Sequence, residues 1–290
     1  MRQCDVNGGD DEQAQREATR GISRSQAGDK MKKPATDFLL IDISNSFTKL
    51  AFASRSRIGR ASKIATPVLS AERIARILHG RESATLVVSS VVPKKNREIK
   101  RAAGNRKVIW LTAQSRLNVR IDYPNPKTIG GDRLANAVAV AKLYGTPAIV
   151  IDFGTAVTFD IVAPDNAYIG GVIAPGLEAM TNFLYDRTAL LPRISLREPR
   201  SAIGKSTNQA MLAGAILGYR GLVREILQRI TAEKSWKGKV RVVATGGYAK
   251  LIARKLPEVE TVYENLTLEG LRLVGCMNSG LSALGEICGM

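Results

Sequence analysis

The stretch FLLIDISNSFTKLAFA, residues 38–53, decides the fold class of this chain. An apolar run carries Asp42 near its end, the polar pair Asn45-Ser46 follows, and a second apolar run begins at Leu50. Short apolar runs separated by turn residues are typical of two strands joined by a tight turn. The sequence therefore predicts a β-hairpin with an acidic residue next to its turn.

The same organisation returns in the second half of the chain, at residues 148–162, which read AIVIDFGTAVTFDIV. At a constant spacing of 110 residues, Asp152 lies over Asp42 and Thr158 lies over Thr48. One such hairpin is weak evidence, because Asp and Asn are common in ordinary turns. Two hairpins that match residue by residue indicate a duplicated chain.

The segments around the two hairpins alternate between strand and helix patterns. They predict strands at 84–92, 108–111, 148–152, 157–162, 167–173 and 240–244, and helices at 71–78, 94–103, 132–144, 206–232, 248–255 and from 268 onward. Such an order is typical of an α/β fold whose sheets are covered by helices. We expect an N-terminal lobe over residues 37–131 and a C-terminal lobe over residues 132–290.

Residues 1–36 are polar and have no sustained apolar period. They predict a disordered leader, and Met31 is a candidate start. Acidic residues occupy the region where a signal peptide has its apolar core, and no apolar stretch approaches the roughly 18 residues of a transmembrane helix. The 3 cysteines are widely spaced, without a C-x-x-C pair, which argues against a disulfide framework and a cysteine zinc site. We therefore expect a cytoplasmic protein without a membrane partner.

The net charge of +17 belongs almost wholly to the part of the chain after residue 36. Its densest basic segment, residues 94–107, contains one acidic residue, Glu98. That segment lacks interleaved aromatic residues and matches no recognised nucleic-acid module, so it predicts a solvated helix face and a field that favours anionic substrates. A nucleic-acid-associated factor stays as an alternative. The single histidine, His79, excludes histidine-rich metal sites.

The two predicted turns have the chemistry of a phosphate site. Backbone N–H groups and side-chain donors converge at each turn and suit phosphate oxygens, whereas Asp42 and Asp152 repel phosphate and require a bridging cation. Gly246-Gly247, between a predicted strand and a predicted helix, permits close backbone approach to a ligand, although such pairs are also common in ordinary turns. The sequence thus predicts a nucleotide cleft between two duplicated lobes.

The segment YPNPKTIGGDR, residues 123–133, delivers Asp132 and Arg133 at the start of a predicted helix. For an unselected Asp-Arg pair, a helix cap and a surface cation are the simpler interpretation. In a cleft, however, an aspartate accepts the proton of a substrate hydroxyl and an arginine binds a carboxylate. The pair therefore suits an acidic substrate that bears an alcohol.

The sequence GKST at residues 204–207 is not a P-loop, because Pro199 stands where that motif needs glycine. It predicts a helix start with Ser206 or Thr207 as the N-cap.

Seven motifs in order resemble those of the type III pantothenate kinases, over nearly all of residues 37–290. They are DISNS at 42–46, GGDRLAN at 130–136, DFGTA at 152–156, GGVIAPG at 170–176, GKST at 204–207, ATGG at 244–247 and LTLEGL at 266–271. The resemblance implies a duplicated actin-like (ribonuclease H-like) ATPase fold, in which each of two lobes has a mixed sheet flanked by helices. It also implies a homodimer, with its interface on the C-terminal lobe.

The resemblance further implies phosphorylation of pantothenate by ATP, the first step of coenzyme A synthesis, with Asp132 as the catalytic base. By the family pattern, pantothenate would be contacted by Tyr123, Gly130, Gly131, Arg133 and Thr207, the last in the neighbouring subunit's site. ATP, with Mg²⁺, would be held by Asp42, Ser44, Asn45, Ser46, Thr48, Lys49, Gly154, Thr155, Gly246 and Gly247. Asp152 would hold a monovalent cation, K⁺ or NH₄⁺.

The chain departs from the family pattern in its first turn, where Ser44 replaces glycine and Ser46 replaces threonine. A Cβ at position 44 would crowd the phosphates or strain the backbone. A non-catalytic or regulatory member of the same fold therefore stays as an alternative, as does another small-molecule kinase of the superfamily.

Overall fold

A computed structural model describes residues 36–234, 236 and 238–280 of the chain. Apart from Thr36, the predicted leader over residues 1–36 lies outside the described residues. None of the helices within them is both long and apolar enough to cross a membrane.

The first sheet has five strands in the order β3-β2-β1-β4-β5. Their bounds are β1 Phe38–Ile43, β2 Phe47–Ala53, β3 Ser62–Ala65, β4 Thr85–Ser90 and β5 Val108–Trp110. Strand β1 pairs antiparallel with β2, so the predicted first hairpin is confirmed. Because β1 also pairs parallel with β4, the sheet is mixed.

The second sheet repeats this topology and adds one edge strand. Its order is β11-β10-β7-β8-β9-β6. The bounds are β6 Arg120–Ile121, β7 Ala148–Phe153, β8 Ala156–Val162, β9 Ala167–Pro175, β10 Arg241–Gly246 and β11 Thr261–Val262. Strands β7 to β11 take the places that β1 to β5 have in the first sheet, with the same parallel and antiparallel neighbours. The predicted duplication is confirmed.

The constant spacing of 110 residues between the hairpins is wrong after the turn. Asp42 pairs with Lys49 across the first hairpin, whereas Asp152 pairs with Thr158 across the second. The first turn is one residue longer, so the structural counterpart of Thr158 is Lys49 and not Thr48. A shift of one residue moves a side chain to the other face of a sheet, which explains why Thr48 is buried while Lys49 is partly exposed.

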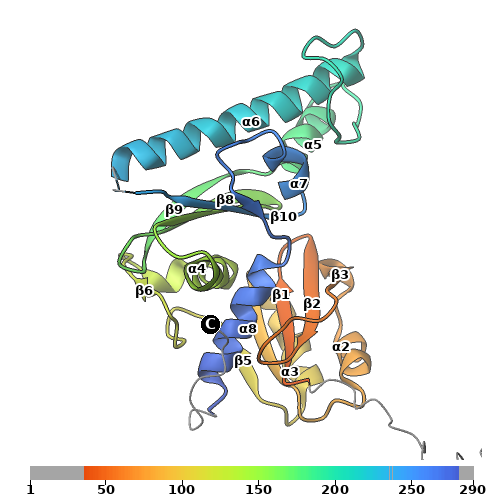
Figure 1. The fold of residues 1–290 in the computed structure, drawn as a ribbon. Coiled ribbons are helices and arrows are strands. Elements are labelled where there is room, and N and C mark those ends of the chain that lie inside the picture. Colours follow the sequence, from red (N-terminus) through yellow and green to blue (C-terminus); the bar gives the residue numbers. More distant parts are fainter. Residues whose placement is uncertain (1–35, 235, 237, 281–290) are drawn as a thin grey trace, which may run out of the picture. The chain divides into compact units, whose positions relative to one another are not determined.

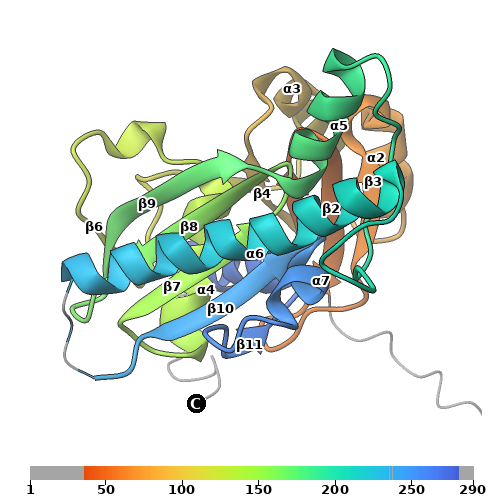
Figure 2. The same ribbon diagram turned by 90° about the horizontal axis from the view of Figure 1, so that it is seen from above.

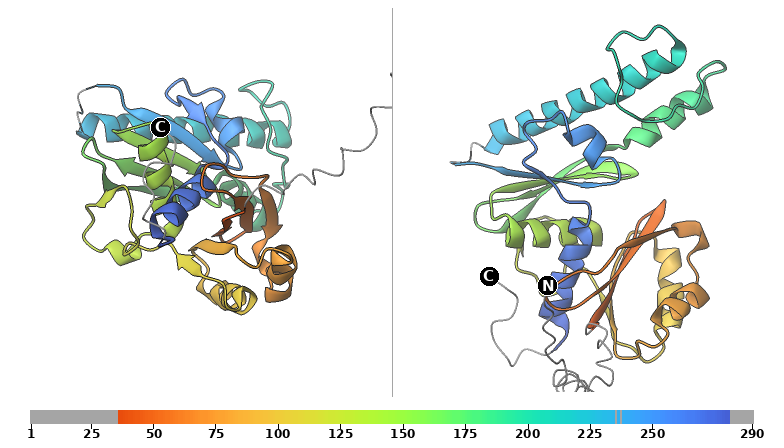
Figure 3. Two further views of the ribbon diagram at one scale, coloured as in Figure 1. Left: turned by 60° about the horizontal axis from the view of Figure 1, so that its bottom comes forward. Right: turned by 45° about the vertical axis from the view of Figure 1, so that its right-hand side comes forward.

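Helices cover both faces of each sheet. Helices α4 (Gly131–Leu143) and α8 (Leu266–Asn278) lie between the two sheets (Figures 1 and 3). The outer side of the first sheet carries α2 (Ala71–Leu78) and α3 (Pro93–Ala103), and the short 3₁₀ segments are η1 (Thr66–Val68) and η2 (Pro126–Thr128). The long helix α6 (Thr207–Lys234) crosses the outer face of the second sheet, beside α7 (Ala249–Ala253), and α5 (Leu177–Arg187) follows β9 (Figure 2).

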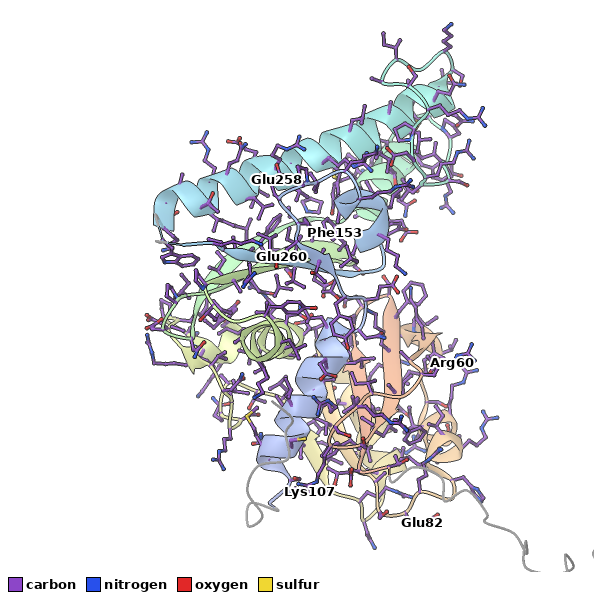
Figure 4. All side chains as sticks on the ribbon, viewed as in Figure 1. Arg60, Glu82, Lys107, Phe153, Glu258 and Glu260 are labelled. Atoms are coloured by element: carbon purple, nitrogen blue, oxygen red, sulfur yellow. The ribbon has the colours of Figure 1, made fainter. Side chains whose placement is uncertain are left out.

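Two partly exposed salt bridges link segments around the second sheet. Glu258 lies below α6 in Figure 4, where it accepts a hydrogen bond of 2.7 Å from Arg224 Nε. Glu260 accepts a hydrogen bond from Arg241 at the start of β10. Because these pairs are partly exposed, we expect each to contribute little to the free energy of unfolding.

The alternation of side chains along β1 and β7 brings both aspartates to the inner side of their sheets. In β1, Leu39 and Ile41 pack toward α2 and α3, so Leu40 and Asp42 face α4 and α8. The same alternation in β7 turns Asp152 toward the inner helices. The two acidic bends therefore face the space between the sheets.

The chain passes between the sheets more than once. Strand β6 precedes residue 131 yet pairs with β9, and α8, near the end of the described chain, packs against β1 and β4. The division into an N-terminal lobe, 37–131, and a C-terminal lobe, 132–290, stays a prediction.

Candidate active site

A cavity of about 530 Å³ opens where the two hairpins meet. Eleven of the predicted site residues line it: Asp42, Ser44, Asn45, Ser46, Lys49, Asp132, Asp152, Gly154, Thr155, Gly246 and Gly247. They come from β1, β2, β7, β10 and the start of α4, which are distant in sequence. The fold thus gathers most of the predicted nucleotide-binding residues and Asp132 in one place.

The tips of the two turns touch across this cavity. Ser46 Oγ and Thr155 Oγ1 are 2.9 Å apart, so their hydroxyl groups share a hydrogen bond. The first turn is closed by the Ser44 N–H, which donates to the Phe47 carbonyl, and the second by the Gly154 N–H, which donates to the Ala156 carbonyl. Two turns of different length at equivalent places in the two sheets therefore bring hydroxyl groups to one point.

Serine at position 44 is accommodated without backbone strain. Among the described residues, Asn166 is the only non-glycine residue with positive φ, so Ser44 does not need the conformation that favours glycine. At the equivalent Gly154, an added Cβ would lie 3.4 Å from the nearest atom, the Ala156 carbonyl oxygen, which is an ordinary contact. Of the two expected consequences of Ser44, backbone strain is therefore wrong, whereas crowding of the phosphates stays a prediction.

Gly246 is a position where glycine is required. Its φ is +93°, and an added Cβ would lie 2.5 Å from Asp152 Oδ1 and 2.6 Å from the Phe153 nitrogen. The end of β10 can therefore approach the second turn only without a side chain at this position.

Three carboxyl groups share the inner end of the cavity. Burial, together with the charge of Asp132, raises the pKa of Asp42 to about 7. Burial and the charge of Asp152 raise the pKa of Asp132, and burial also raises that of Asp152. Lys49 opposes the shifts at Asp42 and Asp152. Within the described chain, four acidic side chains line the cavity, these three and Glu178, against two lysines, Lys49 and Lys63, and this excess of acidic groups favours a bound cation.

The donor set fits a cation that arrives with a nucleotide. Asp42 Oδ1, Ser89 Oγ and Thr245 Oγ1 are buried and make no hydrogen bond of normal geometry among the described residues, although Ser89 lies opposite Asp42 in the register of β1 and β4 and its hydroxyl lowers the pKa of that carboxyl. Within that part of the chain, no three His, Cys, Asp or Glu side chains converge closely enough to hold a metal ion alone. Mg²⁺ usually takes one or two carboxylates, several waters and substrate phosphates, which matches this arrangement.

Asp132 lies in the first turn of α4 and lines the cavity. Its Oδ1 accepts a hydrogen bond of 2.8 Å from the Arg133 N–H, so the carboxylate also stabilises the helix start. The helix approaches β4 closely, because a Cβ at Gly131 would lie 3.0 Å from the Leu111 carbonyl oxygen and 3.1 Å from Ser89 Oγ. Gly130 and Gly131 thus position α4 and do not line the cavity.

Arg133 and Tyr123 form a second group next to the cavity. Arg133 Nε donates to Asp160 Oδ1 at 2.5 Å, and the Tyr168 hydroxyl donates to the same oxygen at 3.3 Å. The rings of Tyr123 and Tyr168 are 6.4 Å apart. Burial raises the pKa of Asp160 to about 7, against the lowering effect of Arg133. Neither Arg133 nor Tyr123 lines the cavity itself, but the buried Asp160 carboxylate holds the Arg133 guanidinium next to it.

Two predicted residues lie elsewhere. The hydroxyl groups of Thr48 and Thr66 share a buried hydrogen bond of 2.9 Å, and Thr66 donates to the Ser44 carbonyl, so Thr48 supports the first turn from behind. Thr207 is exposed at the start of α6 and does not line the cavity. The predicted cap of this helix is confirmed, since Ser206 Oγ accepts a hydrogen bond from the Gln209 N–H.

Ten further described residues line the cavity that were not among the predicted site residues. They are Phe47, Lys63, Val91, Phe153, Ala156, Thr158, Glu178, Ala179, Asn182 and Tyr248. Figure 4 shows Phe153 within the second sheet. Lys63 lies directly opposite Lys49 in the register of β2 and β3, and its Nζ is 3.6 Å from the centroid of the Phe47 ring. A correct pairing of β3 would have identified Lys63, because it shares a face with Asp42.

Comparison with known proteins gives a consistent result. The model of the type III pantothenate kinase family matches residues 38–229. A type III pantothenate kinase of Akkermansia muciniphila is 47% identical over 242 residues, which cover 83% of this chain and 99% of that protein. The enzyme of the same name from Methylacidiphilum infernorum is 44% identical over 237 residues, covering 82% and 87%.

Two solved structures show the fold at low sequence identity. A conserved candidate transcriptional activator of the Baf family from Campylobacter jejuni has a TM-score of 0.56 at 17% identity, covering 84% of this chain and all of that one. A candidate 2-dehydro-3-deoxygalactonokinase from Sinorhizobium meliloti has a TM-score of 0.52 at 13% identity, covering 82% and 98%. The duplicated sheets have the actin-like topology that the motifs implied. On the family match and the identity of these relatives, the chain belongs to the type III pantothenate kinase family.

Proposed function

We propose that this chain transfers the γ-phosphoryl group of ATP to the primary hydroxyl of pantothenate, the reaction that gives the family its name, and so forms 4'-phosphopantothenate for coenzyme A synthesis. The observation that carries this proposal is the contact of 2.9 Å between Ser46 and Thr155, above a cavity that Asp132 lines. Such a contact brings the phosphate-binding turns of both halves to one ligand.

The nucleotide side is supported by the two turns and by Lys49. Hydroxyl and N–H donors at the turns would bind the phosphate oxygens, and the Lys49 ammonium would offset their charge. A bound Mg²⁺ would neutralise charge on the transferred phosphoryl group, with Asp42 as its carboxylate. Asp152 would hold the monovalent cation, K⁺ or NH₄⁺. A reducing cytoplasm is the compartment that we propose, from the spacing of the cysteines.

On the acceptor side, the hydroxyl oxygen of pantothenate attacks the γ-phosphorus, the bond from that phosphorus to the β,γ-bridging oxygen breaks, and ADP leaves. Asp132 accepts the hydroxyl proton, for which it must lie within hydrogen-bond reach of that oxygen. Arg133, held by Asp160, would bind the carboxylate of pantothenate beside Tyr123. Most of the rate enhancement would come from positioning and charge stabilisation, as in other phosphoryl transfers.

A homodimer is supported by exposed apolar side chains on adjacent elements of the second half. Phe183 and Leu184 in α5 are 61% and 40% exposed, and Leu217 in α6, the helix against which α5 packs, is 41% exposed. Large apolar side chains grouped in this way are typical of interaction surfaces. Thr207, at the start of α6 on the same side of the chain, would then reach the site of the partner subunit.

The direct test is release of ADP, measured with pantothenate in the presence and absence of K⁺. We expect pantothenate-dependent turnover that Asp132→Asn lowers by roughly 10²-fold or more while ADP binding is kept. An equal rate in that variant would remove Asp132 from the mechanism. Absence of turnover in the unaltered protein, with nucleotide still bound, would favour the non-catalytic alternative. Turnover with another alcohol alone would favour a different small-molecule kinase.

A further inference from the structure

We propose that Asn136 and Thr267 are positioning residues that orient the Asp152 carboxylate in the cavity. The inference rests on the proposed function, because it assigns the carboxylate a role in nucleotide binding. Thr267 Oγ1 is 2.9 Å from Asn136 Oδ1, and Asn136 Nδ2 is 3.4 Å from Asp152 Oδ2. Asn136 is 1% exposed and Thr267 is 2% exposed, so water does not replace these contacts.

The chemistry of the three groups fixes the direction of this chain of hydrogen bonds. An ionised carboxylate only accepts, so the Asn136 amide must turn its NH₂ group toward Asp152. The amide oxygen then faces Thr267, whose hydroxyl must donate to it. Thr267 thereby prevents the amide from flipping, and a flipped amide would place an oxygen against the carboxylate.

The chain of bonds leaves the other oxygen of Asp152 for the cavity. Asp152 Oδ1 lies 2.5 Å from the position of a Cβ at Gly246 and 3.8 Å from that of a Cβ at Gly154. Both glycines line the cavity. With Oδ2 held by Asn136, Oδ1 points to the region where the turns meet.

Helix packing explains how two distant segments reach each other. Asn136 lies within α4 and Thr267 at the start of α8, the two helices between the sheets. A Cβ at Gly270 would overlap the Ala135 carbonyl oxygen, so glycine at this position allows the close approach. A buried asparagine inside a helix lowers helix propensity and needs hydrogen-bond partners, which argues that its amide serves Asp152.

The two equivalent aspartates of the duplicated fold differ in their hydrogen bonding. Asp42 is the counterpart of Asp152, yet its Oδ1 has no hydrogen-bond partner among the residues that the structure describes. The equivalent backbone positions of the two sheets thus carry one carboxylate that Asn136 contacts, Asp152, and one without such an amide contact in the described chain, Asp42. This difference is what we expect if Asp152 must keep one orientation whether or not nucleotide is bound.

The test compares Thr267→Val with Thr267→Ser. Valine keeps the shape of threonine and removes the donor, whereas serine keeps the donor. We expect Thr267→Val to weaken binding of ADP with Mg²⁺ in K⁺ buffer, measured by calorimetry, by about tenfold, as for other groups that orient a metal-binding carboxylate. The KM for pantothenate should change less than about twofold, and Thr267→Ser should bind ADP as the unaltered protein does.

The matched control is Thr181→Val, a buried threonine in α5 whose hydroxyl donates to carbonyls of its own helix. It should leave ADP binding unchanged. Thermal unfolding of each variant shows whether it is folded, and Asn136→Ala provides a second way to break the chain if Thr267→Val does not fold. Equal ADP binding in Thr267→Val and the unaltered protein, or equal loss in Thr267→Ser, would overturn the inference.

These outcomes are separable from failure of the proposed function. If the unaltered protein binds ADP but does not phosphorylate pantothenate, the proposed function fails while the calorimetric comparison still decides the role of Thr267. If pantothenate is phosphorylated and the valine variant binds ADP normally, only the positioning role is wrong.

Discussion

Replacing Asp42 by asparagine should stabilise the protein at alkaline pH while it removes activity. Asp42 is 6% exposed, and its Oδ1 has no hydrogen-bond partner among the described residues. Burial, followed by the charge of Asp132, raises its pKa from 3.8 to about 7. The folded protein without nucleotide therefore carries a carboxylate whose ionisation opposes folding, and the neutral amide of asparagine lacks this cost.

The sign and size of the change in the free energy of unfolding follow from the difference between the pKa values of Asp42 in the folded and unfolded protein. Because the folded pKa is the higher one, the Asp42 carboxyl lowers the free energy of unfolding progressively as pH rises from about 4 to about 7. A shift of about 3 units corresponds to at most ~4 kcal/mol above pH 7. Relaxation of the site reduces this limit, so we expect Asp42→Asn to gain about 1 to 3 kcal/mol at pH 8.5 and less at pH 5.

The assay is urea unfolding at pH 5 and pH 8.5 without nucleotide or Mg²⁺. Asp122→Asn is the matched control, since the Asp122 side chain is 63% exposed and its ion pair with Arg120 is long, at 3.6 Å. We expect the control to change the free energy of unfolding by less than about 0.5 kcal/mol at both pH values. A gain for Asp42→Asn that does not grow with pH, or a loss at pH 8.5, would refute the reasoning.

The remaining predictions concern nucleotide binding, backbone conformation and assembly. Lys63→Gln should raise the KM for ATP about fivefold, equivalent to ~1 kcal/mol. The control Lys94→Gln removes the same charge from an exposed position on α3 and should leave the KM for ATP unchanged. Equal KM values for the two variants would exclude Lys63 from the site. Gly246→Ala should lower the free energy of unfolding by about 2 kcal/mol or more, because φ is +93° and Asp152 Oδ1 is in the way, while Gly247→Ala meets no atom within 4 Å and should be near neutral. Phe183→Glu should convert a dimer to a monomer in sedimentation velocity, and an unchanged sedimentation coefficient would argue against α5 as the interface.

Much of the fold was predictable because its central strands are short apolar runs with turn residues between them. The predicted strands at 148–152 and 240–244 correspond to β7 and β10 within one or two residues. Three of the described strands were missed: β6 and β11 have two residues each, too few for any periodicity, and β3 has four, of which two are apolar. Helix α5 was missed because its Phe183 and Leu184 are exposed, so the helix lacks the apolar stripe that faces a core.

The site was predictable where function depends on the end of a strand, and less so where it depends on register. Asp42 and Asp152 follow from the hairpin pattern alone. Thr48 was assigned to the nucleotide from the family pattern, and the alignment of the two hairpins without a gap placed it over Thr158. The extra residue in the first turn directs the Thr48 side chain to the other face of the sheet. Lys63 was missed because β3 itself was not predicted, so the pairing of β3 with β2, which places Lys63 opposite Lys49, could not be inferred.

The register of the two sheets explains how a duplicated fold can bind an asymmetric ligand. One rung of the first sheet reads Lys63, Lys49, Asp42 and Ser89, and the equivalent rung of the second reads Ile173, Thr158, Asp152 and Thr245. Two lysines directly opposite each other repel and destabilise a sheet, so their presence on the first rung favours an anion that faces them. The second rung has no lysine, and there Gly246 lets the backbone approach Asp152 closely. The two sheets therefore share backbone positions but differ in charge: the first rung carries two lysines, which suit the phosphates of the proposed nucleotide, and the second carries only the Asp152 carboxylate, which suits the proposed cation.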